Sequence, residues 1–471
     1  MRKFNRLTLT LKQEGYKMPY NRESAGKGGH SDFVRNPDVQ QFLSDCDYMK
    51  PPSDDEAKLI AAQFMAAPKG TPPSLPNYVV ASDASKSDAP INDKLPSTQL
   101  GFIKVSHVLV SLDKYAELID PKSRFVDPFK AADMHRNAQP ITYVLPGSNI
   151  RYRGSISVKN GFRQAVFDQF NANRRDGTNR MVLTDTLLAL NGNSLSINKC
   201  PSCNETIEKK IFLPTTLTHE CPKCNAVIYA TDWLRLHEGI SDFGDNTSAM
   251  TRMMNAVEHL LLGAFIMELL NSTPSSLNKI AFVIDGPLAL FGEPAKVHQR
   301  LMALIHQANT KLRELGLDPV LIMGLQKTGN VMDHARLLER FLPGGVLRVI
   351  DDTYRQTYIT GGDTPSENFG SETYYGQDFL FKTERGRIFN FALPYPFADK
   401  GSSGADFATK KVELNRYGSL IERACDLIRH FELDLYDNAI VPVALAHRHA
   451  SISLVPGGKV LDLLARAGLS Y

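Results

Sequence analysis

The sequence lacks several features that would assign it to a specialised class. Its 471 residues include only 6 cysteines and carry a formal net charge of +3, a balance that neither requires nor excludes a nucleic-acid partner. No apolar run approaches the roughly 20 residues needed to span a bilayer. The basic N-terminal stretch 1–20 has no apolar segment of the kind found in secretory signals. We therefore expect a cytoplasmic protein that does not use a membrane.

The chain also lacks an internal repeat and a Walker-type Gly-x4-Gly-Lys-Ser/Thr loop. Without that loop it cannot translocate DNA with ATP by itself. Its length argues against one simple core, and changes in composition predict several units. These are an N-terminal extension at 1–75, a core made of 76–110 and 236–471, an insertion at 111–198 and a cysteine module at 199–235.

Apolar strands alternate with helices along the chain. We expect strands at 78–85, 101–110, 279–286, 319–325, 346–350, 379–381, 388–393 and 439–447. We expect helices at 54–65, 250–270, 297–315, 332–341, 412–429 and 459–467. The segment 86–97 is rich in Ser, Asp, Pro and Lys, which indicates a loop. Strands interleaved with helices predict an α/β protein built on a sheet.

Four of the cysteines form two Cys-x2-Cys pairs, Cys200 with Cys203 and Cys221 with Cys224. This spacing lets two tight turns present four thiolates to one tetrahedral Zn²⁺. Four thiolates leave no open coordination position, so we expect a structural zinc ribbon and not a catalytic zinc. A redox role for the pairs is the weaker alternative. The ribbon would stabilise an inserted segment, or contact DNA or a partner.

Two apolar runs, 79–83 and 281–286, lead into Asp83 and Asp285. A run that is apolar on both faces belongs in the middle of a sheet. If the two strands are neighbours, the aspartates emerge together at one edge, where a divalent cation would neutralise their repulsion. Taken singly, each aspartate is explained more simply as a turn residue.

The helix 250–270 carries Glu258 on its apolar side. An ionised carboxylate there costs several kcal/mol unless something pairs with it. A cation shared with Asp83 and Asp285 would be such a partner. Pairing with an arginine such as Arg252, or extension to solvent, is an equal alternative.

The C-terminal stretch 441–449 is apolar and predicts a strand with His447 and His449 on one face. Histidine can ligate a metal or shuttle a proton, although a structural, hydrogen-bonded histidine is the more common case. Basic residues gather in two other places, at Arg151, Arg153, Lys159 and Arg163, and at Arg174, Arg175 and Arg180. Either cluster could follow a phosphate backbone, and a solvated helix or loop face is the simpler alternative.

Four stretches in this order resemble the NurA nuclease family: VVASDAS, RMMNAVEHLLL, FVIDGPLALFG and VALAHRHASIS. LIMGLQKTG and FALPYPF are also similar to that family. The resemblance covers the chain from about residue 75 onward, without most of 111–235. One departure is that the usual Asp-Gly-Ser reads Asp83-Ala84-Ser85 here, and alanine disfavours the positive φ that glycine permits.

This resemblance implies an RNase H-like core with a mixed sheet and flanking helices, to which the zinc ribbon is added. It also implies a dimeric DNA nuclease that uses Mn²⁺ or Mg²⁺ and works with a HerA-like hexameric ATPase, in DNA end processing or anti-phage defence. The residues carried over by motif are Asp83, Glu258 and Asp285 as metal-binding carboxylates, His447 as the active-site histidine, and Lys327 and Tyr395 as substrate contacts. Lys327 would bind phosphate, with an exposed surface lysine as the alternative.

Three carboxylates suit phosphodiester hydrolysis with two cations about 4 Å apart. His447 would orient the attacking water or protonate the leaving group. A transposase or integrase on the same fold is disfavoured, because such enzymes place their glutamate after both aspartates. A catalytically inactive DNA-binding or adaptor subunit is the alternative from another class, although the acidic and histidine positions are all present.

Overall fold

The computed structural model describes residues 33–46, 51–91, 94–118, 130, 138, 140–172, 182–360, 369–432 and 439–452. The chain divides into two compact units, Met1–Lys50 and Pro51–Tyr471. The described part of the first unit contains α2 (Pro37–Ser44), which begins where the Asn36 side chain accepts a hydrogen bond from the Asp38 amide. The helix expected at 459–467 and the second basic cluster, at 174–180, lie outside the described residues.

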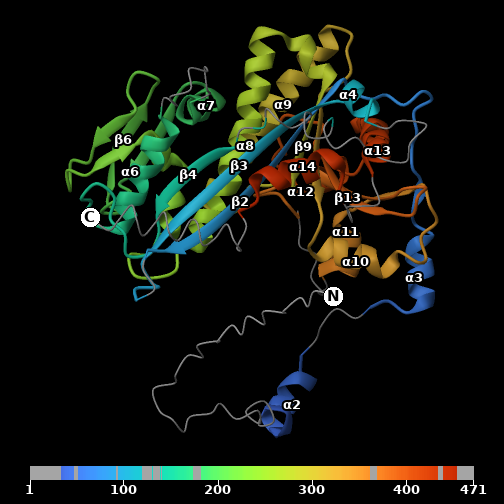
Figure 1. Cartoon of the computed structure of the whole chain (residues 1–471), viewed down its shortest axis with the longest axis horizontal. Coiled ribbons are helices and arrows are strands. Elements are labelled where there is room, and N and C mark those ends of the chain that lie inside the picture. The colour runs from blue at the N-terminus through green and yellow to red at the C-terminus, as the bar shows by residue number, and fades with distance from the viewer. Residues whose placement is uncertain are drawn as a thin grey trace, which may run out of the picture. The chain divides into compact units, whose positions relative to one another are not determined.

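Nine strands of the described part of the second unit form one mixed sheet (Figure 1). In order they are β1 (Met65–Ala66), β11 (Val346–Val349), β12 (Gly376–Lys382), β13 (Ile388–Pro394), β10 (Leu321–Gln326), β9 (Ile280–Asp285), β2 (Tyr78–Pro90), β3 (Gln99–Ser111) and β4 (Ile141–Pro146). β9 runs parallel to β2 and β10, and the other neighbours are antiparallel. This agrees with the expected α/β class and a mixed sheet.

Helices cover both faces of the sheet. They are α3 (Asp54–Ala61), α4 (Leu112–Ala116), α6 (Val158–Phe170), α7 (Leu183–Leu190), α8 (Thr247–Ser272), α9 (Val297–Glu314), α10 (Asn330–Leu338), α11 (Asp352–Arg355), α12 (Gly404–Lys410), α13 (Leu420–Phe431) and α14 (Val441–Ala450). Short turns of 3-10 helix are η1 (Ala230–Leu234), η2 (Leu236–Gly239), η3 (Pro274–Lys279), η4 (Glu293–Lys296) and η6 (Leu414–Tyr417), and η5 (Gln356–Thr360) is a π-helical turn.

β9 lies in the interior of the sheet because both of its faces are apolar. Phe282 and Ile284 pack into the core formed with α8 and α9, whereas Ala281 and Val283 pack into the core formed with α13 and α14. Alternate side chains of a strand point to opposite faces, so one short run supplies both cores. The expected strand at 279–286 is confirmed, and β2 is its neighbour.

The strand that contains Asp83 is longer than the sequence indicated. β2 continues to Pro90 and pairs with β3 along its whole length, from Tyr78 opposite Ser111 to Pro90 opposite Gln99. The expected loop at 86–97 is therefore wrong for its first half, because thirteen residues of β3 offer partners to thirteen of β2. Asp83-Ala84-Ser85 is extended strand and not a turn, so alanine fits this position without a positive φ.

Residues 51–75 and the expected insertion both contribute to the second unit. β1 pairs with β11, and α3 packs its Ala57 and Ile60 into a core with α10. β4 forms one edge of the sheet, and α6 and α7 belong to the same core as α8. The structure thus divides the chain near residue 50 and not near residue 75, because these segments supply buried apolar side chains.

The stretch around His447 is a helix, which corrects the expected strand. α14 begins at Val441 with Pro442 in its first turn. Proline suits that position because its missing N–H would have no helical partner there. The alanines that follow favour a helix more than a strand. His447 and His449 therefore lie in the last turn of a helix and do not share one face of an extended chain.

Two further helices differ from their expected bounds. The helix predicted at 412–429 is divided into η6 and α13, because Gly418 between them adopts φ 55°. α8 is long and apolar enough to span a membrane by length and composition, but 61% of the relevant window is buried inside the protein. Such burial is typical of a core helix in a folded domain.

Candidate functional site

Three side chains from distant parts of the sequence gather at one end of the sheet. Asp83 belongs to β2, Asp285 ends β9 and His447 belongs to α14. One ligand atom from each lies within 4.8 Å of the other two. The closest printed pair is His447 Nδ1 and Asp83 Oδ2, at 2.7 Å. These three residues are called the acidic site below.

The backbone explains why the acidic site forms. β2 and β9 are parallel, and their pairing runs as far as Ser82 opposite Ile284. The next residue on each strand is Asp83 or Asp285, so the two carboxylates emerge side by side. α14 packs on the same face, where the Ser85 hydroxyl donates a hydrogen bond to the carbonyl of Ala450. Strand register and this contact together place His447 over Asp83.

The electrostatics of the acidic site favour a cation. Burial raises the pKa of Asp83, and the charge of Asp285 raises it further, while the hydrogen bond with His447 opposes the shift. The side chain of Asp83 is 8% exposed and that of His447 is 60% exposed. The site is thus anchored in the protein but open on the histidine side. Two carboxylate oxygens and an imidazole nitrogen form a donor set that fits a divalent cation.

Lys327 is the positive neighbour of this site. Its Nζ lies 2.5 Å from Oδ2 of Asp285. Lys327 follows β10 directly, and β10 is parallel to β9 with Leu325 opposite Asp285. The carboxyl ends of two parallel strands therefore bring lysine and aspartate together. Arg336 of α10 donates to the Lys327 carbonyl at 3.3 Å and supports this turn. The Lys327 side chain is 26% exposed and paired with Asp285, so the alternative of an exposed surface lysine does not describe it.

Glu258 does not belong to the acidic site, which corrects the expected three-carboxylate cluster. It lies on α8, on the opposite face of the sheet from α14. The Ser82 hydroxyl donates to Glu258 Oε1 at 2.7 Å. Ser82 and Asp83 are adjacent on β2, so their side chains point to opposite faces.

Burial raises the pKa of Glu258 to about 8, and the charges of Asp83 and Asp285 add to that shift. Glu258 is thus in electrostatic contact with the site without sharing its ligand atoms. The alternative partner, Arg252, is excluded because its guanidinium pairs with Glu293 at 2.6 Å.

Tyr395 lies away from the acidic site. It follows β13, whose Ala392 pairs with Gly324, so Tyr395 lies towards the start of β10. Asp285 and Lys327 lie at the other end of β9 and β10. The ring of Tyr395 is 4% exposed and stacks on Phe397. The similarity of FALPYPF to the NurA family implied a substrate contact, but the position of Tyr395 makes it part of the core.

Two serines of the site were not identified from the sequence. Ser82 holds Glu258, and Ser85 holds the end of α14. Both flank Asp83 in the same motif. The available signal was the period of two along a strand, which assigns adjacent residues to opposite faces. The period alone does not say which groups lie on each face of the strand, and this depends on the packing of α8 and α14 against β2.

The four cysteines form a separate cluster, the cysteine module. It consists of the hairpin β5 (Leu195–Lys199) with β6 (Thr206–Phe212) and the hairpin β7 (Thr218–Glu220) with β8 (Val227–Tyr229). Cys200 Sγ lies 3.8 Å from Cys224 Sγ, and Cys203 Sγ lies 3.9 Å from Cys221 Sγ. A tetrahedron with Zn–S bonds of about 2.3 Å has edges of about 3.8 Å. All four thiols are free of disulfides, so the cluster could bind a structural metal such as zinc.

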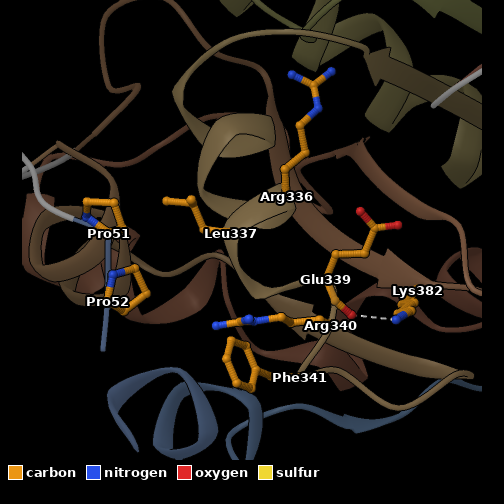
Figure 2. Close-up of a pocket in the computed structure, with 8 residues that line it drawn as sticks. All are labelled: Pro51, Pro52, Arg336, Leu337, Glu339, Arg340, Phe341 and Lys382. Carbon is orange, nitrogen blue, oxygen red and sulfur yellow. Dashed lines mark hydrogen bonds between the residues drawn. The ribbon is translucent and has the colours of Figure 1, made fainter. Parts of the chain in front are cut away.

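A surface hollow of about 500 Å³ beside α10 offers no comparable chemistry (Figure 2). Its cations already have partners. Lys382 donates to the carbonyls of Glu339 and Leu342, and Arg340 pairs with Asp54. Figure 2 shows Arg336 pointing away from the two prolines on the far side of the hollow. We interpret the hollow as a structural joint between α10 and residues 51–52.

Comparison of the sequence with models of protein families and with curated proteins returned no match.

Proposed function

We propose that this protein is a metal-dependent DNA nuclease whose active centre is the acidic site. The observation that carries the proposal is the convergence of Asp83, Asp285 and His447, with ligand atoms within 4.8 Å of one another. These residues come from three segments that are each more than 150 positions apart in the chain. Such a convergence of charged groups at one edge of a sheet is uncommon unless it serves binding or catalysis.

The order of the strands supports an RNase H-like core. β2, β3 and β4 form an antiparallel meander, and the chain returns through α8 to β9 and β10, which run parallel to β2. In space this gives the order β4-β3-β2-β9-β10. Asp83 and Asp285 lie on β2 and β9, which are neighbours at the centre of this order.

The acidic site would hold one Mn²⁺ or Mg²⁺ through Asp83, Asp285 and His447. A divalent cation bound there would polarise the phosphodiester and lower the pKa of a bound water. Imidazole is a donor that Mg²⁺ rarely takes and that softer divalent cations accept, so the donor set favours Mn²⁺. Glu258 would support the site from behind Ser82 through their hydrogen bond and not as a direct ligand.

The positions of Lys327 and His447 beside the two aspartates suggest their roles. Lys327 Nζ would leave Asp285 to bind a phosphate oxygen of the substrate. His447 makes its hydrogen bond to Asp83 through Nδ1, which fixes the ring. When a cation is bound, Nδ1 would ligate it in place of this hydrogen bond, and Nε2 would be free to exchange a proton at the reacting oxygen. These contacts involve phosphate and not bases, so little sequence preference is expected.

The proposed partners rest on the resemblance to NurA proteins. A HerA-like hexameric ATPase would deliver duplex DNA, and two copies of this chain would act together as a homodimer. The absence of a Walker-type loop in the sequence is consistent with a borrowed motor. The alternative, an inactive DNA-binding or adaptor subunit, would keep the fold but would not need the acidic site.

The test is cleavage of labelled single-stranded and duplex oligonucleotides by the purified chain with Mn²⁺, Mg²⁺ or no divalent cation. We expect cleavage that requires the cation and is lost in Asp285→Asn, which keeps the shape of the side chain and removes its charge. Asp113→Asn is the matched control, because Asp113 is exposed and lies outside the site. Equal cleavage by wild type and Asp285→Asn would overturn the proposed site.

A further inference from the structure

A cavity of about 640 Å³ lies between the cysteine module and the start of α9. One wall is the end of β5 with the first cysteine turn. The other is made by η1 and η2 together with Lys296, which ends η4. The cavity is separate from the acidic site, and none of the residues assigned to nuclease chemistry lines it.

The charges that line this cavity are unbalanced. Its acidic residues are Asp232 and Glu238, and both are already paired with arginines. Asp232 pairs with buried Arg163 at 2.7 Å, and Glu238 pairs with Arg235 at 2.6 Å. Because both acidic residues are paired with arginines, the lysines are the remaining charged residues that line the cavity.

Three lysines line the cavity without a counterion: Lys159, Lys199 and Lys296. Among the residues that the structure describes, no carboxylate lies within ion-pair distance of any of the three. The four cysteines beside the cavity would offset part of this charge when they hold zinc, because Zn²⁺ and four thiolates together carry a charge of −2. The cavity keeps a smaller positive excess, which an anion would neutralise.

Lys296 is the most informative of the three. Its Nζ lies 3.8 Å from the centre of the Trp233 ring, so a cation–π contact takes the place of a counterion. Burial lowers the pKa of Lys296 to about 8; the charge of Arg235 adds to that shift and the charge of Glu238 opposes it. A half-buried ammonium beside an aromatic ring binds an anion more strongly than an exposed one, because water screens it less.

We propose that this cavity binds the phosphate backbone of a single DNA strand. Three separate ammonium groups surround this one hollow. They fit the several negative charges of a phosphate chain better than they fit the single charge of a ligand with one carboxylate. The partly exposed indole of Trp233 carries Lys296 over its ring, so a strand bound by Lys296 would change the surroundings of this indole. The choice of DNA as the source of the phosphate rests on the proposed nuclease function. The cavity would hold a strand away from the acidic site, and the cysteine module would form one of its walls.

Trp233 makes the binding directly observable because it is the only tryptophan in the chain. The probes are a single-stranded oligonucleotide, a deoxynucleoside monophosphate and inorganic phosphate, each titrated without Mn²⁺ or Mg²⁺. We expect the oligonucleotide to change the emission of Trp233 saturably at the lowest concentration. Equal affinity for the monophosphate would identify a small-molecule site instead. No change with any probe would overturn the proposal.

Substitution of the lysines tests the same cavity by affinity. In Lys159→Gln/Lys199→Gln/Lys296→Gln, the oligonucleotide should bind roughly tenfold more weakly or worse. The slope of log affinity against log salt should fall by about 2, as expected for three lost contacts with a single strand. The matched control is Lys114→Gln/Lys209→Gln/Lys279→Gln, which removes the same charge from exposed positions outside the cavity. Equal losses in both triple variants would overturn a specific site.

Asp285→Asn separates this proposal from the proposed nuclease function. Asp285 does not line the cavity, so this variant should keep the Trp233 response while losing cleavage. If wild-type protein does not cleave DNA but the response and the lysine dependence persist, the nuclease function fails and the binding site stands. If cleavage is present and the response is absent, the binding site fails alone.

Discussion

The acidic site and the cysteine module are both clusters of metal-ligand residues, but they are built in opposite ways. The four cysteines lie within 25 positions, from Cys200 to Cys224, and are brought together by two local hairpins. The acidic site joins Asp83 to His447, which are 364 positions apart. The module closes a tetrahedron of sulfur, whereas the acidic site leaves the His447 side chain 60% exposed. A closed set suits a structural metal, and an open set suits chemistry on a substrate.

This contrast also determines what the sequence can reveal. Local clusters appear as spacing, so the cysteine module was predicted residue by residue. The acidic site depends on strand register and on which face each side chain takes, and these are tertiary properties. Experiments that disable one cluster at a time should therefore give different kinds of loss: folding for the module and activity for the acidic site.

The largest expected effect is on the cysteine module. Cys221→Ser, or removal of zinc by a strong thiol-reactive reagent, should abolish a metal-binding free energy on the order of 10 kcal/mol and unfold the module. The measurement is zinc content together with thermal unfolding. Cys46→Ser is the control, because Cys46 is exposed and lies in the first unit. A variant that keeps its melting temperature and has no zinc would show that the module needs no metal.

The next largest effect is on the acidic site. Asp83→Asn should reduce Mn²⁺-dependent cleavage about a thousandfold, which corresponds to about 4 kcal/mol in the barrier. The melting temperature should change little, because the burial of Asp83 already raises the pKa of its carboxyl and opposes the charged form. Initial rates of cleavage test the expected loss of activity, and thermal unfolding tests the expected melting temperature. A large loss of stability with little loss of rate would make Asp83 a structural residue.

Low pH should lower the folding stability of the whole second unit, which contains both the acidic site and the cysteine module. Burial lowers the pKa of His237, His298 and His334 to about 4 and that of His259 to about 3. Below pH 6.5 the unfolded chain binds these protons and the native protein does not, so stability falls as the pH decreases from 6.5 towards 4. We expect a loss of a few kcal/mol between pH 7 and pH 5.

The acid effect is measured by thermal unfolding at the two pH values. Circular dichroism follows the whole chain, and the fluorescence of Trp233 follows the region beside the module. Coincident transitions are expected because the four histidines lie in one compact unit. Two separate transitions would mean that the module unfolds independently.

The smallest expected effect is on the cleavage rate of a Glu258 variant. It distinguishes the role of Glu258 from the roles of Asp83 and Asp285. Glu258→Gln keeps an acceptor for the Ser82 hydroxyl and changes the charge little at neutral pH, because burial raises the pKa of Glu258 to about 8. We expect cleavage to fall tenfold or less, about 1.4 kcal/mol. A thousandfold loss, equal to that of Asp83→Asn, would mean that Glu258 ligates the metal directly during the reaction.

Much of the fold could be predicted from the sequence, and the errors have physical causes. The apolar run before Asp285 predicted an interior strand because both faces were apolar. The apolar run before His447 looked the same, but Pro442 fits the first turn of a helix and the alanines favour one. Residue pattern also could not assign Glu258 to a face, since this depends on the packing of α8 against β2. Tyr395 was misplaced because a motif carries no information about the end of the sheet on which it lies.

Crystals grown with Mn²⁺ and measured at the manganese and zinc absorption edges would test the central claim most directly. The proposed function predicts a zinc signal among Cys200, Cys203, Cys221 and Cys224, and a manganese signal among Asp83, Asp285 and His447. Lys327 should move away from Asp285 when manganese is bound. A manganese signal elsewhere, or its absence at millimolar Mn²⁺ while the zinc signal is present, would contradict the assignment of the acidic site as the catalytic centre.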